Sequence, residues 1–270
     1  MQPFLLQSDF LTIPSFAFMI MMASLLATWA TYATAPKKGL SQLYVLDIAI
    51  VCTIGGVIGM RLFHVFVEAP DYYWEHPLRV FEVWRGGFVS YGAFLGVFAS
   101  GIAYCRWRKI DTLKYVDHMV LYAGPILIFT TRIGCLLAGC CFGKPTHHLE
   151  AEWLTYLVFN NPSSDAGSRH LGVPLWPTQI YAMTYAVILF GINYWTYKHQ
   201  KFKGQIILTF LIAYAIFRSL LEFIRGDADR GVYFNNTIST AQIMSLLFAS
   251  TCLVLYFIFR KKYPLEKKAD

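Results

Sequence analysis

Residues 131–146, TRIGCLLAGCCFGKPT, combine the side chains of this sequence that are best suited to chemistry. An arginine, Arg132, lies inside an apolar run, where a charged side chain costs at least about 2.5 kcal/mol if the run crosses a membrane. Gly134 and Gly143 follow it and allow a backbone or a ligand to approach closely. Half of the six cysteines lie in the same stretch, at Cys135, Cys140 and Cys141. Together these residues predict a site for an anionic group, with thiols beside it.

The composition indicates which elements must position these residues. Of the 270 residues, 56% are hydrophobic and only 14% are charged, whereas soluble domains carry about 25% charged residues. The apolar runs are continuous and about 20 residues long, which favours membrane helices over the alternating strands of a barrel. The basic residues that give the net charge of +7 flank these runs, so membrane topology explains the charge and nucleic-acid binding is not expected.

Seven apolar runs predict an all-α polytopic membrane protein with seven transmembrane helices, built as a single membrane domain over residues 1–270. The segment 139–175, between the fourth and fifth helices, is polar and is expected to face outward. The first run is long for a signal peptide and has no preceding Lys or Arg, so we expect a retained helix. The runs are 13–33, 43–67, 86–105, 115–138, 177–197, 204–224 and 238–259.

The distribution of basic residues predicts the orientation of the helices. Loops that follow the first, third, fifth and seventh runs hold 14 of the 23 Lys and Arg residues. Because cytoplasmic loops are enriched in positive charge, the N-terminus is expected outside and the C-terminus in the cytoplasm. Asp47, Asp117 and His118 then lie near inner helix ends, where solvation or helix capping explains them.

Three arginines, Arg61, Arg132 and Arg218, fall within the outer halves of predicted helices. The carboxylate available nearby in sequence is Glu222, four residues after Arg218 and on the same helix face. One carboxylate cannot neutralise three guanidinium groups, and phosphate is a natural bidentate partner for arginine. This pattern favours a lipid-phosphate site; the alternative is that the arginines pair only for helix packing. Tyr214, Arg218, Glu222 and Arg225 recur as one polar stripe of a predicted helix.

Five segments occur in an order and spacing that resemble one family. They are GMRLFHVF, RVFEVWRGGFVSYGAFLG, TRIGCLLAGCCFG, WPTQIY, and YAIFRSLLEFIRGDADR followed by ISTAQIMSL. With seven predicted helices, the sequence is identified as a divergent member of the prolipoprotein diacylglyceryl transferase family. The resemblance implies transfer of the diacylglyceryl group of phosphatidylglycerol to the lipobox cysteine thiol of a prolipoprotein, releasing glycerol phosphate. It also implies no cofactor and no metal, membrane lipids and the prolipoprotein signal peptide as partners, and the bacterial cytoplasmic (inner) membrane as location.

The resemblance assigns roles residue by residue. Arg132 and Arg218 would act in catalysis on the phosphate, and Tyr91 stands where well-known members carry a histidine proposed as a base. Further departures are Cys135 in place of an asparagine, Cys140 in place of a glutamate and Trp176 in place of a histidine. The residues expected to bind substrate are Arg61, Gly134, Tyr214, Glu222, Arg225, Gln179 and Gly143.

The three cysteines and the acceptor leave alternatives open. The thiols could pack as small polarizable side chains, act as reactive thiols or an outward-facing disulfide, or ligate a metal, although neither CxxC pairs nor zinc-type histidine spacing occur. A divergent member could modify another acceptor, a lipid or a thiol, with Cys140 or Cys141 as nucleophile. A non-catalytic lipid-binding scaffold is the third possibility.

Overall fold

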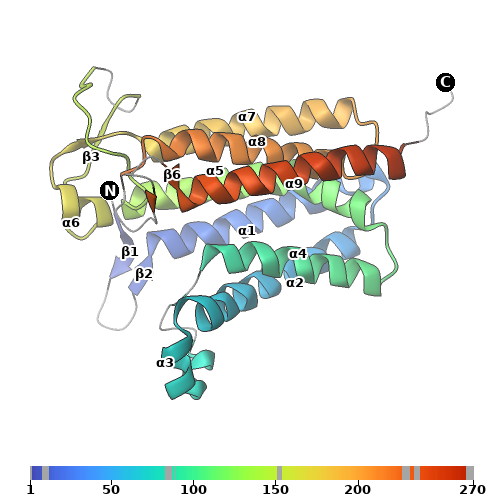
Figure 1. Cartoon of the computed structure of the whole chain (residues 1–270), viewed down its shortest axis with the longest axis horizontal. Coiled ribbons are helices and arrows are strands. Elements are labelled where there is room, and N and C mark those ends of the chain that lie inside the picture. Colours follow the sequence, from blue (N-terminus) through green and yellow to red (C-terminus); the bar gives the residue numbers. More distant parts are fainter. Residues whose placement is uncertain are drawn as a thin grey trace. The chain divides into compact units, whose positions relative to one another are not determined.

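The computed structural model is predominantly helical (Figure 1). It describes residues 2–7, 12–82, 87, 89–150, 154–226, 232–233 and 238–265, with only the backbone at 90–91, 232–233, 238 and 240–241. The chain forms two compact units, one of residues 1–30 with 116–270 and one of residues 31–115. Each unit is described by itself below, and the single domain remains a prediction.

Seven helices of 18 or more residues occur among the described residues, and each matches one predicted apolar run. They are α1 (Ser15–Thr34), α2 (Gln42–Phe63), α4 (Ser90–Trp107), α5 (Thr112–Ala138), α7 (Thr178–Lys198), α8 (Gln205–Glu222) and α9 (Thr240–Lys262). Five described segments are long and apolar enough to cross a membrane: α1, α2 with the π-helical turn after it, α5, α8 and most of α9. Helix α4 is rich in glycine and serine and α7 contains four tyrosines, which lowers their hydropathy. The count of seven spans therefore stays a prediction.

Short elements that the sequence did not predict lie before and between the long helices. Helices α3 (Pro70–Glu75) and α6 (Asp165–His170) are short, with six residues each. Three antiparallel strand pairs are formed by β1 (Phe4–Gln7) with β2 (Thr12–Pro14), β3 (Leu157–Val158) with β4 (Pro174–Leu175), and β5 (Val232–Tyr233) with β6 (Ile238–Ser239). The polar segment 139–175 has a small core of its own, made of Phe142, Leu157, Phe159, Ala166 and Leu175.

Helices α2 and α4 pack through glycines in the smaller unit. A side-chain carbon on Gly59 would lie 2.2 Å from the Gly92 carbonyl oxygen, and one on Gly96 would lie 2.0 Å from the Gly55 carbonyl oxygen. Each helix therefore carries two glycines four residues apart, which let the backbones touch. Small residues at this spacing are a common means of helix association in membranes, where apolar surface alone gives little preference for a protein partner.

In the larger unit, Asp117 near the start of α5 fixes the beginning of α8. Its carboxylate accepts hydrogen bonds from the backbone N–H of Gly204 at 2.7 Å, that of Ile207 at 3.0 Å and the Gln200 amide at 2.7 Å. Because the first N–H groups of a helix have no partner within it, this carboxylate caps α8. The capping interpretation is confirmed for Asp117, although the helix that it caps is α8 and not its own helix, α5.

The two other polar residues assigned to inner helix ends differ from that expectation. Asp47 accepts a hydrogen bond from the Tyr104 hydroxyl, which ties α2 to α4. His118 is only 2% exposed and packs edge-on against the ring of Tyr122, so solvation at a helix end is wrong for this residue. Both side chains serve contacts between or within helices.

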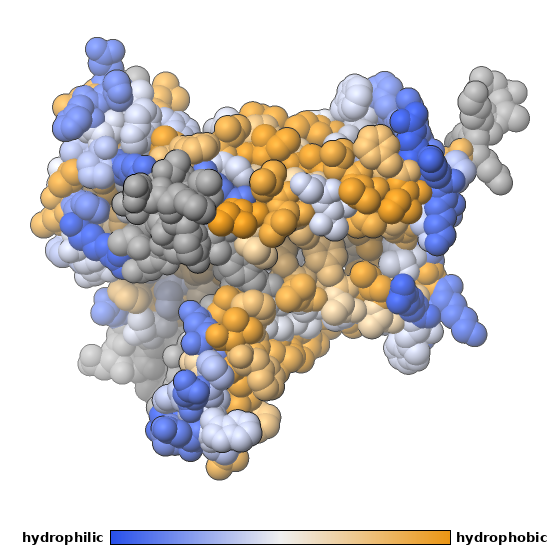
Figure 2. Space-filling model, viewed as in Figure 1, coloured by the Kyte–Doolittle hydropathy of each residue, from blue (hydrophilic) through white to orange (hydrophobic). Residues whose placement is uncertain are grey.

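The outer surface of the larger unit suits a lipid environment. Figure 2 shows a largely apolar flank over α7 and α9, with hydrophilic residues gathered near the helix ends. Exposing so many large apolar side chains to water over a continuous surface is unfavourable, so this flank is expected to contact lipid acyl chains. Exposed residues on α9 include Leu246, Leu247, Leu253, Val254, Phe257 and Ile258.

The glycine contact between α2 and α4 gives a first prediction. Gly96→Ala should lower the free energy of unfolding by about 1–3 kcal/mol, because the new methyl group collides with the Gly55 carbonyl. Gly191→Ala on α7 is the matched control, since nothing lies within 4 Å of its added carbon. Thermal unfolding of purified protein in detergent measures both. Equal midpoints for the two variants would contradict the close packing of these helices.

Candidate functional site

The end of α5 is a tight turn that reverses the chain. Gly139 has φ +71°, and the Cys140 N–H donates to the Cys135 carbonyl at 3.0 Å. A left-handed glycine of this kind is a frequent helix terminator. Cys141 is also left-handed, with φ +57°, which is uncommon for a residue with a side chain. The two left-handed residues turn the chain back over the last turn of α5.

Hydrogen bonds from three parts of the larger unit hold this turn. Four consecutive carbonyl groups accept them, so the backbone at the turn is fixed rather than solvated. The backbone N–H of Ala166 donates to the Gly139 carbonyl at 2.8 Å, and that of Gly226 donates to the Phe142 carbonyl at 3.0 Å. The side chains of two α7 residues donate to the carbonyls between them: Gln179 Nε2 to Cys140 at 2.9 Å and Thr178 Oγ1 to Cys141 at 2.6 Å. Gln179, predicted as a substrate-binding residue, thus orients the backbone of a cysteine.

Gly143 is required by a close approach of two backbones. A side-chain carbon at this position would lie 2.4 Å from both Cβ and the carbonyl oxygen of Trp176. Its N–H donates to that same carbonyl at 3.2 Å, and its backbone pairs with Arg225 in an isolated bridge. Gly134 is likewise required by close packing, since a side-chain carbon added there would lie 2.9 Å from Met19 Cβ on α1.

The turn brings three thiols together. The sulfur atoms of Cys135, Cys140 and Cys141 lie within 4.8 Å of one another, and within the described part of the chain these are the one His/Cys/Asp/Glu group close enough to share a metal ion. Cys135 is buried, and the other two are partly exposed. Thiol hydrogen bonds with Cys135 and Cys140, together with the charges of Arg225 and Arg132, lower the pKa of the Cys141 thiol.

Arg132 lies on α5, partly buried, and its neighbours include cysteines and tyrosines. Its Nη1 is 3.7 Å from the Cys135 sulfur, and the ionisable groups acting on it also include Cys141, Tyr185 and Tyr214. Within the residues that the structure describes, no carboxylate lies within ion-pair distance of its guanidinium. A guanidinium without a carboxylate partner is well suited to bind an anion such as phosphate.

Tyr185 on α7 is a site residue that sequence reasoning missed. It is 5% exposed, and among the described residues its hydroxyl has no hydrogen-bond partner. Arg132 and Arg218 both lie close enough to act on this hydroxyl electrostatically, and the ring stands edge-on to Tyr214 at 6.3 Å. The available sequence signal is that Thr178, Tyr185 and Asn193 recur at helical spacing within an otherwise apolar run.

Helix α8 carries the predicted polar stripe only in part. Arg218 donates to the carboxylate of Glu222 one turn later, and Glu222 is 4% exposed. The helix ends at Glu222, so the interpretation of Arg225 as part of the helical stripe is wrong. Instead, Arg225 lies in the segment beyond the helix, where its Nη2 is 3.4 Å from the Cys141 sulfur.

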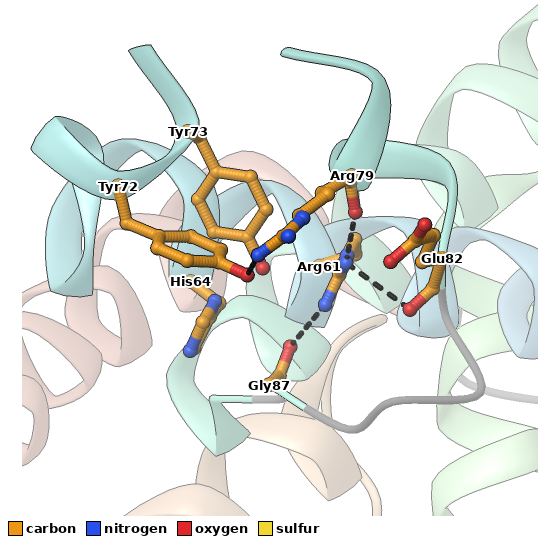
Figure 3. A pocket seen from close by; sticks show the side chains of 7 residues that line it. All are labelled: Arg61, His64, Tyr72, Tyr73, Arg79, Glu82 and Gly87. Atoms are coloured by element: carbon orange, nitrogen blue, oxygen red, sulfur yellow. Dashed lines mark hydrogen bonds between the residues drawn. The ribbon is translucent and has the colours of Figure 1, made fainter. Parts of the chain in front are cut away.

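Arg61 belongs to the smaller unit and binds backbone. Its guanidinium donates to the carbonyls of Arg79 at 2.6 Å, Val80 at 3.0 Å and Glu82 at 3.3 Å. It lies in a pocket of about 220 Å³. Figure 3 shows the other residues that line this pocket, among them His64, Tyr72, Tyr73 and Gly87. These contacts fix the segment after α3, and the expectation that Arg61 binds substrate stays a prediction.

Tyr91, expected in place of the family's histidine, lies in the first turn of α4, and its side chain is outside the described residues. The remaining predicted site residues, apart from Arg61, all belong to the larger unit. There the arrangement offers two guanidinium groups and an unsatisfied hydroxyl to an anion, with thiols one helical turn away. A phosphate diester would find both charge and hydrogen-bond donors at this place.

Comparison with known proteins identifies the family of the chain. Residues 3–258 match the family described as prolipoprotein diacylglyceryl transferase. A phosphatidylglycerol–prolipoprotein diacylglyceryl transferase of Clostridium tetani is 30% identical over 96% of this chain and 97% of the relative. Phosphatidylglycerol–prolipoprotein diacylglyceryl transferase 2 of Clostridium perfringens is 30% identical over 93% of each chain, and a relative of the same kind from Nitrosomonas europaea is 32% identical over 80% of this chain and 74% of its own.

The match extends over nearly all of the sequence, from before α1 to within α9, and includes the cysteine turn. With its apolar helices, the chain is a polytopic membrane protein, and it belongs to the prolipoprotein diacylglyceryl transferase family.

Proposed function

We propose that this chain transfers the diacylglyceryl group of phosphatidylglycerol to the cysteine thiol of a prolipoprotein lipobox. The observation that carries the proposal is the guanidinium of Arg132, which has no carboxylate partner among the described residues and lies beside the unsatisfied Tyr185 hydroxyl. Relatives named for this activity match 93–96% of the chain at 30% identity, which supports it.

The charge balance fits a phosphate diester. Glu222 neutralises Arg218 through their ion pair, whereas Arg132 has no carboxylate within reach in the described chain. A phosphodiester carries one negative charge and offers two free oxygens to a planar guanidinium. Arg132 would therefore bind the phosphate, with Arg218 and the Tyr185 hydroxyl at its edge, and Tyr214 would support Tyr185 through ring contact.

The reaction breaks the bond between the glyceryl carbon and its phosphate oxygen. The acceptor sulfur loses its proton and forms a bond to that carbon, and glycerol phosphate leaves with the bonding electrons. Negative charge grows on the leaving oxygen, so a guanidinium already aimed at the phosphate stabilises the transition state more than the ground state. We assign this role to Arg132.

The remaining predicted residues would position these groups. Gln179 and Gly143 would keep the cysteine turn in place beside the phosphate, and Arg225 would link the segment after α8 to Cys141. Tyr91 would take the place of the family's histidine as a hydrogen-bonding group for the acceptor. Arg61 would contribute by holding the segment after α3 in place.

The proposal includes seven membrane crossings, with the chain start outside, the C-terminus in the cytoplasm and the bacterial inner membrane as location. The positive-inside pattern supports this, because 14 of the 23 basic residues fall on one predicted side.

A green fluorescent protein fused after residue 270 should fluoresce, and alkaline phosphatase at the same place should be inactive. Active phosphatase there would reverse the proposed orientation.

The transfer itself can be measured with purified protein, phosphatidylglycerol labelled in its glyceride and a lipobox peptide. Arg132→Ala should lower the transfer rate by about 100-fold or more, since a donor to the developing charge is lost. Arg169→Ala is the control, because that arginine forms an exposed ion pair with Asp165 on α6 and should leave the rate unchanged. A wild-type protein that transfers nothing, or an active Arg132→Ala variant, would disprove the proposal.

A further inference from the structure

The three thiols at the end of α5 are arranged around a point, not in a pair. Their sulfur atoms lie within 4.8 Å of one another, although Cys135 belongs to the helix and the other two belong to the turn. Ligands of Zn²⁺ with metal–sulfur bonds of about 2.3 Å stand about 3.8 Å apart in a tetrahedral site. The measured spacing allows all three sulfur atoms to reach one ion with small rotations of their side chains.

The surroundings of the cluster resemble the outer shell of a metal–thiolate site. Arg132 Nη1 is 3.7 Å from the Cys135 sulfur, and Arg225 Nη2 is 3.4 Å from the Cys141 sulfur. Such N–H donors stabilise thiolates and set the orientation of ligands. The backbone that carries Cys140 and Cys141 is held through its carbonyls by Gln179 and Thr178, so the ligand positions are fixed in advance.

The three thiols also leave a place for one more ligand. Zn²⁺ sites are almost always tetrahedral, and three thiolates fill three of the four positions. A fourth ligand would complete the tetrahedral coordination. In the described part of the chain, the group that could share an ion consists of these three cysteines.

We propose that Cys135, Cys140 and Cys141 bind a thiophilic divalent cation such as Zn²⁺, and that its open coordination position receives the acceptor thiol. The role of the open position rests on the proposed function; the metal site does not. The acceptor thiol releases its proton to solvent on binding the ion. Its sulfur then bonds to the glyceryl carbon as the carbon–oxygen bond to phosphate breaks, with no change of oxidation state. The ion thus supplies what the family's histidine would otherwise contribute at the position of Tyr91.

Metal binding is tested on the reduced full-length protein in detergent, titrated with Zn²⁺ against a chromophoric chelator. The wild type should bind one ion per chain, and the triple variant Cys135→Ser, Cys140→Ser, Cys141→Ser should lose that binding. The matched control replaces the three other cysteines, Cys52, Cys105 and Cys252, and should bind as the wild type does. If the cluster variant fails to fold by circular dichroism, Cys140→Ala alone should weaken binding by at least tenfold.

The open position is read out with Co²⁺ in place of Zn²⁺. Thiolate-to-cobalt absorption should appear on loading, and a lipobox peptide should change it, whereas the same peptide with serine in place of its cysteine should not. No stoichiometric binding by the wild type, binding retained by the cluster variant, or a disulfide among these cysteines in protein taken from membranes overturns the metal site. An unchanged cobalt spectrum, or full-rate transfer by chelator-treated protein, overturns the role of the open position.

The two proposals fail separately. One bound Zn²⁺ per wild-type chain, without any diacylglyceryl transfer by protein loaded with the ion, would refute the proposed function and support the metal site. Transfer by a wild-type protein that binds no metal would refute the site and support the function.

Discussion

The proposed site in the larger unit depends on the guanidinium of Arg132, which has no carboxylate partner among the described residues. Arg132 lies on a membrane-length helix, and in the described part of the chain the buried carboxylate of Glu222 forms its ion pair with Arg218. Leaving a guanidinium in such surroundings is expensive, and it becomes favourable when a bound anion supplies the missing charge. The unsatisfied hydroxyl of Tyr185 beside it has the same requirement, since a buried polar group without a partner costs about 1–3 kcal/mol. One phosphate diester would meet both.

The cysteine turn joins this charge to the rest of the larger unit. Its four consecutive carbonyls accept bonds from α6, from the start of α7 and from the segment after α8. A displacement of any of these elements would therefore move the thiols relative to Arg132. Such coupling suits a reaction in which a sulfur atom and a phosphate must be placed on opposite sides of one carbon atom.

The sequence predicts the long helices well because their apolar runs have the length that a membrane requires; the first run, 13–33, became α1 at Ser15–Thr34. It does not predict the small core of segment 139–175, because residues such as Phe142, Leu157 and Leu175 are far apart in the sequence and meet only in the fold. The convergence of the thiols was also beyond pattern analysis. In a continuous helix, positions five and six residues apart point away from each other, and only the left-handed Gly139 and Cys141 bring them together. The backbone partners of Arg61 are tertiary contacts that no local spacing encodes.

The most direct measurement of the central claim is an experimental structure of the protein with phosphatidylglycerol bound in lipid nanodiscs. The account predicts the lipid phosphate within hydrogen-bond distance of the Arg132 guanidinium, with an oxygen also facing the Tyr185 hydroxyl. A phosphate bound elsewhere, with Arg132 paired to a carboxylate of the chain itself, would contradict it.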